Sequence, residues 1–131
     1  MSALERYEGG CHCGQVRFSV EVDPAADVLR CNCSMCRRHG FLHVIVPQSR
    51  FSLLQGSEAL QLYKFGTGIA RHLFCRNCGV ESFYVPRSNP DGYSVHAACI
   101  EGFEGYAVVD IDGAGDWEGA TAHIAHLSQE S

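Results

Sequence analysis

The sequence lacks several features that would place it in other classes of protein. No apolar run approaches the roughly 18 residues that a membrane-spanning helix needs. The first six residues lack the charged and then apolar pattern of a secretion signal. Internal repeats, low-complexity stretches and Pro/Ser-rich linkers are also missing, and only four residues are proline. We therefore expect a cytoplasmic protein, built as a single domain over residues 1–131.

Basic residues are scarce as well. The chain has 10 Lys and Arg against 15 Asp and Glu, which gives a formal net charge of −5 with histidine neutral. The one basic cluster is the short run Arg37-Arg38-His39. Nucleic-acid phosphates are bound by clustered Lys and Arg, so a general nucleic-acid binder is excluded and small-molecule partners are expected.

Most of the chain shows the pattern of short strands separated by turns. Val16, Phe18, Val20 and Val22 alternate with polar residues, which is the two-residue period of a half-buried strand. Residues 1–10 are interpreted as a short lead-in. Further strands are predicted at residues 41–46, 51–54, 60–65, 69–74, 80–85 and 93–99. The sequence therefore predicts a mostly β fold.

One helix is predicted near the end of the chain. Asp116 is a suitable N-cap, and an apolar stripe at helical spacing follows it. The stripe consists of Trp117, Ala120, Ile124 and Leu127. Amphipathic helices usually contribute to the core, so we expect this face to pack on the sheet.

Cysteine is the residue that the chain has in excess, with eight copies. Seven of them occur in tight groups, and Cys99 stands alone. The groups are Cys11 and Cys13, then Cys31, Cys33 and Cys36, then Cys75 and Cys78. Without an export signal, such spacing indicates metal binding rather than disulfides, and we expect two Zn²⁺ per chain.

Two of these groups fit a closed structural zinc site. Zinc prefers four tetrahedral ligands, and the pairs Cys11/Cys13 and Cys75/Cys78 would supply four sulfurs. A glycine follows each pair, at positions 14 and 79, which lets the chain turn beneath the metal. Such a site contributes folding free energy and no chemistry.

The remaining group, Cys31, Cys33 and Cys36, fits an open catalytic zinc site whose fourth position takes water or substrate. Three thiolates leave the site with a net charge of −1, so it suits an incoming thiol better than an activated water. The reaction expected is that of a thiolate with a small aldehyde. Three alternatives remain: Cys99 closes the site, the domain is a non-catalytic zinc-stabilised binding module, or the loop serves redox or metal buffering.

The same motifs resemble a known family. Cys11-His12-Cys13-Gly14, Cys31-Asn32-Cys33-Ser34-Met35-Cys36 and Phe74-Cys75-Arg76-Asn77-Cys78-Gly79 are similar to the glutathione-dependent formaldehyde-activating enzymes, and the run from Gly79 to Pro90 is closest to the centromere protein V branch. The resemblance covers about residues 8–127.

The family implies a β-tent-type fold and the same division between a structural and a catalytic zinc. It also implies a carbon–sulfur lyase-type activity on S-hydroxymethylglutathione, the adduct of glutathione and formaldehyde.

Residues near the open site offer further hypotheses. Arg37 or Arg38 would bind a substrate carboxylate, against the alternative of solvated surface charge. His39 or His43 would move a proton, although a histidine on an apolar strand is more often a hydrogen-bonded core residue. The long loop adds the possible pocket residues Ser88, Asn89 and Asp91.

Overall fold

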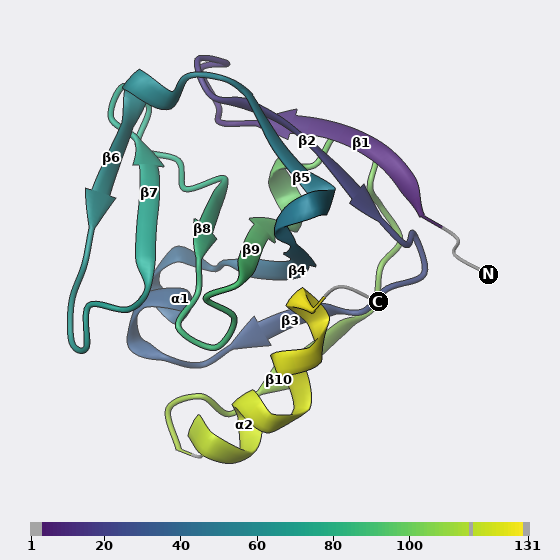
Figure 1. Ribbon diagram of the computed structural model, residues 1–131, viewed down its shortest axis with the longest axis vertical. Coiled ribbons are helices and arrows are strands. Elements are labelled where there is room, and N and C mark those ends of the chain that lie inside the picture. Colours follow the sequence, from purple (N-terminus) through teal and green to yellow (C-terminus); the bar gives the residue numbers. More distant parts are fainter. Residues whose placement is uncertain (1–3, 116, 130–131) are drawn as a thin grey trace.

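The computed structural model describes residues 4–115 and 117–129, which form two twisted sheets and two short helices (Figure 1). The prediction of a mostly β fold with a short C-terminal helix is confirmed. No helix in the described part of the chain is long and apolar enough to cross a membrane.

The smaller sheet has three antiparallel strands in the order β1-β2-β5. They are β1 (Glu5–Gly10), β2 (Arg17–Val22) and β5 (Phe51–Gln55). The lead-in predicted for residues 1–10 was wrong, because Glu5–Gly10 pairs with β2 along its length. Most β1 side chains are exposed, so the strand carries no apolar period. Gly9 is buried where a Cβ would collide with the Cys99 carbonyl oxygen.

The larger sheet has seven strands in the order β10-β3-β4-β9-β8-β7-β6. Their bounds are β3 (Val28–Cys31), β4 (Leu42–Pro47), β6 (Leu60–Tyr63), β7 (Arg71–Cys75), β8 (Phe83–Val85), β9 (Gly92–His96) and β10 (Val108–Ile111). β10 pairs with β3 in parallel and the other pairs are antiparallel. Strands β3 and β10 were not predicted, because neither alternates: β3 is buried at three of its four positions, and β10 is mostly exposed. Residues 97–99 of the predicted 93–99 strand form a 3₁₀ turn instead.

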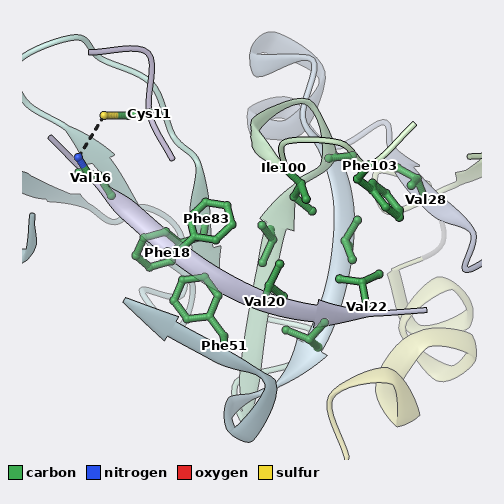
Figure 2. Packing of buried hydrophobic residues seen from close by; sticks show 14 of the residues in the cluster. Cys11, Val16, Phe18, Val20, Val22, Val28, Phe51, Phe83, Ile100 and Phe103 are labelled. Carbon is green, nitrogen blue, oxygen red and sulfur yellow. Dashed lines mark hydrogen bonds between the residues drawn. The ribbon is translucent and has the colours of Figure 1, made fainter. Parts of the chain in front are cut away.

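The core lies between the sheets, where β2 crosses the larger sheet (Figure 2). Phe18 of β2 stacks on Phe51 at 5.4 Å between ring centroids, and Phe51 contacts Phe83 of β8 at 4.7 Å. Phe18 and Val20 are almost completely buried. Burying each such side chain contributes roughly 1.5–3 kcal/mol, so this cluster fixes how the sheets meet.

Two helices flank the larger sheet. α1 (Ser34–His39) follows β3, so the second half of the predicted cysteine loop is helical. α2 (Trp117–Ile124) continues into a 3₁₀ turn, and its predicted N-cap, Asp116, lies outside the described residues. The buried Asn89 side chain donates to the Ile124 carbonyl oxygen at 2.9 Å, and Asp91 accepts from the Ser128 hydroxyl. Asn89 and Asp91 therefore hold the C-terminal segment in place.

Candidate metal centre

Four cysteine sulfurs meet where the β1–β2 turn lies against the end of β7. The Sγ atoms of Cys11 and Cys13 are 3.6 Å apart, and those of Cys13 and Cys75 are also 3.6 Å apart. With Cys78, all four lie within 4.8 Å of one another. A tetrahedral metal with metal–sulfur bonds of about 2.3 Å would separate its sulfurs by about 3.8 Å. The four-cysteine cluster therefore fits a tetrahedral metal ion.

Backbone amides support this cluster. The Gly79 N–H donates to the Cys75 carbonyl oxygen at 2.7 Å, with Gly79 in the left-handed region at φ 80°. The Val16 N–H donates to the Cys11 sulfur at 3.3 Å (Figure 2). Burial raises the pKa of the Cys11 thiol to about 11, so this sulfur ionises at neutral pH only beside a cation.

The second cluster lies at the junction of β3 and α1. Cys31 ends β3, Cys33 is the N-cap of α1, and Cys36 lies within that helix. The Cys36 N–H donates to the Cys33 sulfur at 3.5 Å. The three Sγ atoms lie within 4.8 Å of one another, and no further His, Cys, Asp or Glu ligand atom of the described residues joins them. The described chain thus supplies three ligands here.

The three sulfurs are close enough to control one another's ionisation. The Cys31 and Cys36 thiols donate to Cys33 and lower its pKa to about 2. The same interactions raise the pKa of both donors, Cys36 most strongly. One thiolate is therefore stabilised by its neighbours, and ionising all three requires a cation. Gly113 leaves room for this cluster, since a Cβ there would lie 2.6 Å from the Cys31 sulfur.

A cavity of about 210 Å³ opens beside the three-cysteine cluster. All three cysteines line it, and His43, His72 and Tyr84 add polar groups. Its apolar walls include Leu29, Ile45, Phe65, Ile111, Trp117 and Ile124. Trp117 and Ile124 belong to the helix face predicted to pack on the sheet. That prediction was incomplete, because these two side chains also form a wall of the cavity.

His43 is the centre of a buried polar network. Its Nδ1 lies 2.8 Å from the Ser94 hydroxyl and 3.3 Å from the Tyr84 hydroxyl, which is itself 3.9 Å from the Cys36 sulfur. Its Nε2 is buried and has no hydrogen-bond partner among the described residues. Burial lowers the pKa of His43 to about 4, so the ring is neutral at pH 7.

A second histidine lies in the same cavity. His72 Nδ1 is 2.8 Å from a Glu81 carboxylate oxygen, and both side chains are buried. The His72 ring also stacks on Tyr84 at 4.5 Å between centroids. Sequence reasoning singled out none of these three side chains as site residues. Their proximity depends on the β7–β8 register, which places His72 opposite Tyr84.

The predicted arginines of α1 do not line this cavity. Arg38 donates to the Ser34 carbonyl oxygen at 3.0 Å, and Arg37 lines a separate hollow. His39 is exposed. The cation at the cavity is Arg87, whose guanidinium carbon lies 3.8 Å from the centre of the Trp117 ring. Ser88, another predicted pocket residue, lines the cavity beside it.

Cys99 does not close the three-cysteine site. Burial raises its pKa to about 11, and the neighbouring charges that add to this effect belong to Cys11 and Cys78. Cys99 therefore lies towards the four-cysteine cluster, and it belongs to neither group of clustered sulfurs. The alternative in which Cys99 supplies the missing ligand was wrong.

The chain is similar to known proteins in sequence and in structure. Residues 6–109 match the family described as glutathione-dependent formaldehyde-activating enzyme. A Schizosaccharomyces pombe protein named an uncharacterized lyase is 25% identical over 105 residues, which are 77% of this chain and 73% of the yeast protein. A crystal structure of a Rhodobacter sphaeroides protein is 42% identical, with a TM-score of 0.70 over 77% of this chain and 97% of that one. The chain therefore belongs to the glutathione-dependent formaldehyde-activating enzyme family.

Proposed function

We propose that the chain is a zinc-dependent carbon–sulfur lyase that joins a thiol to a small aldehyde and reverses the reaction. One observation carries the proposal: three clustered cysteines line a cavity, without a fourth ligand among the described residues. The family and the lyase-named yeast relative support this type of chemistry. Both metals are zinc in this proposal, with the four-cysteine cluster structural and Cys31, Cys33 and Cys36 catalytic.

The donor sets support zinc. Clusters of four or three thiolates select soft or borderline metals, and zinc sites with three protein ligands keep a position for substrate. When bound, the zinc would lower the pKa of an incoming thiol, so that the thiol ionises near neutral pH. Three buried or half-buried thiols within 4.8 Å of one another fit this role, since they ionise together only beside a cation.

The chain's own residues would then guide the reaction. The substrate thiolate sulfur forms a bond to the carbonyl carbon, the C=O electron pair moves to oxygen, and this oxygen takes up the proton that the thiol released. The apolar walls exclude water from the thiolate. His43, which is neutral at pH 7, and Tyr84 contribute polar groups to the wall of the same cavity.

The test must separate catalysis from the spontaneous reaction, because formaldehyde adds to thiols without help. Exchange NMR of formaldehyde with glutathione, and separately with a compact thiol such as 2-mercapto-3-phenylpropanoate, measures how fast each hydroxymethyl adduct forms and breaks down at equilibrium. Zinc-loaded wild-type protein should raise the forward and reverse rates for at least one of these thiols in proportion to its concentration, and Cys33→Ser should not. A non-catalytic binding module would leave the exchange at the background rate for glutathione and for other thiols. That result would contradict the proposal.

A further inference from the structure

The cavity beside the three-cysteine cluster is larger than formaldehyde requires and smaller than glutathione requires. Its volume is about 210 Å³, whereas one water needs roughly 10–15 Å³ on this type of measure. Formaldehyde has only two non-hydrogen atoms and would fill a small part of it. Pockets for drug-sized ligands measure about 300–1,000 Å³, so much of a tripeptide would remain outside. The volume suits a compact organic molecule.

The walls of the cavity are apolar. Side chains from four different elements contribute to them: Leu29 of β3, Ile45 of β4, Ile111 of β10, and Trp117 with Ile124 of α2. None of the described lining residues is Asp or Glu. The ammonium group of glutathione would therefore find no carboxylate partner here, and burying a charge without a partner is costly. An aromatic or branched aliphatic group fits these walls better.

One permanent cation lines the cavity. The half-buried Arg87 places its guanidinium over the Trp117 ring, 3.8 Å from the centroid. None of the described carboxylates forms an ion pair with Arg87. A guanidinium stacked on an aromatic face keeps its N–H edge available, and that edge matches a carboxylate with two parallel hydrogen bonds. Arg87 is therefore suited to one substrate carboxylate.

A second polar side chain, His43, lines the cavity. His43 is 4% exposed, and its Nε2 has no partner among the described residues. The Ser94 and Tyr84 hydroxyls both face Nδ1, so we assign the proton to Nε2 from this network. Nε2 has almost no accessible surface, so His43 contributes a polar wall, and recognition of a substrate carboxylate falls to Arg87.

We propose that the substrate is an apolar monocarboxylate, an inference that rests on the proposed function. It carries an aromatic or branched aliphatic group among the apolar walls, a carboxylate on Arg87, and a thiol or aldehyde group beside the three cysteines. Glutathione, with two carboxylates, an ammonium group and two peptide units, offers more polar groups than this cavity can pair.

Binding can be tested separately from catalysis because Trp117, which lines the cavity, is the single tryptophan of the chain. Fluorescence titrations of zinc-loaded protein would use 3-phenylpropanoate and its neutral analogue 3-phenylpropan-1-ol, neither of which has a thiol. The wild type should bind the acid at least tenfold more tightly than the alcohol. Arg87→Gln should remove most of this preference while keeping alcohol binding, which reports an intact cavity. Arg87→Lys should retain part of the preference.

Arg38→Gln is the matched control, because Arg38 is an exposed cation outside the cavity. It should bind both probes as the wild type does. The proposal would be overturned if Arg87→Gln kept the wild-type preference for the acid over the alcohol, or if Arg38→Gln lost it. It would also be overturned if the wild type bound glutathione more tightly than 2-mercapto-3-phenylpropanoate. Acid binding without any accelerated carbon–sulfur exchange would support the binding site and contradict the lyase, so the two failures are distinguishable.

Discussion

The most direct test of the three-cysteine site is to remove the space that Gly113 leaves for it. An alanine Cβ at this position would lie 2.6 Å from the Cys31 sulfur, whereas ordinary contact begins at 3.4 Å. The sulfur or the loop must therefore move by about 0.8 Å. Metal–sulfur distances in proteins vary by only about 0.2 Å around their standard values. A displacement four times this tolerance should cost one metal–sulfur bond.

Gly113→Ala should thus weaken metal binding at the three-cysteine site alone. Changes next to metal ligands typically lower affinity about 10–100-fold, and loss of a ligand belongs at the upper end of this range. The assay is a competition between zinc-loaded protein and a colourimetric chelator, which should show one of two zincs released at a lower chelator concentration than in the wild type. Circular dichroism should stay unchanged, because the four-cysteine cluster and the core are untouched.

Gly115→Ala is the matched control in the same loop. Its Cβ would approach the exposed Asp112 carboxylate, which accepts from the Asn32 side chain and the Gly115 N–H, so the added methyl group presses on this carboxylate instead of a sulfur. The control should keep wild-type zinc release. Identical release curves for Gly113→Ala and Gly115→Ala would refute the reasoning that Gly113 protects the Cys31 sulfur.

Four further substitutions test other parts of the structure. Cys75→Ser should abolish cooperative unfolding in thermal melts, because binding of a structural zinc contributes about as much as the whole free energy of unfolding of a typical domain. Cys33→Ser should instead fold, hold one zinc and stay inactive. Folding lowers the pKa of His43 from 6.5 to about 4 because the side chain is buried. The unfolded state therefore binds a proton at a higher pH than the folded state does. As the pH falls from 6.5 to 4, the free energy of unfolding should drop by about 3 kcal/mol. Urea titrations of His43→Gln should lack this part of the drop. Glu81→Leu leaves His72 unpartnered and should lose about 1–3 kcal/mol in urea; an unchanged midpoint would contradict the buried pair.

The sequence was sufficient to predict which cysteines group together. Spacing within each CxC, CxCxxC and CxxC turn is local information, and the preference of zinc for four ligands then pairs the two distant turns that have two cysteines each. The alternation of Val16, Phe18, Val20 and Val22 likewise predicted β2, because one face of that strand is buried. Strands β1, β3 and β10 were missed, since they are short or carry mostly exposed side chains.

The rest of the cavity could not be predicted, because it depends on contacts between residues distant in sequence. His72 meets Tyr84 through strand register, and Arg87 meets Trp117 because the buried Asn89 holds the end of α2. Basic residues adjacent to Cys36 looked like carboxylate binders from proximity in sequence. The helix α1 directs Arg38 back to the Ser34 carbonyl oxygen instead. Proximity in sequence is thus a poor guide to a site assembled from several strands.

The two cysteine clusters differ in how much of the chain they connect, and under the proposed function this difference would let one fold carry a structural and a reactive metal. Cys13 and Cys75 are 62 residues apart in sequence and join the two sheets, so a metal between them closes a long loop. Closing a long loop removes much conformational entropy from the unfolded chain. The second cluster spans only Cys31 to Cys36, which β3 and α1 already hold together. A metal held there would therefore add little to the stability of the fold, and the proposed substrate thiol would bind without unfolding the protein.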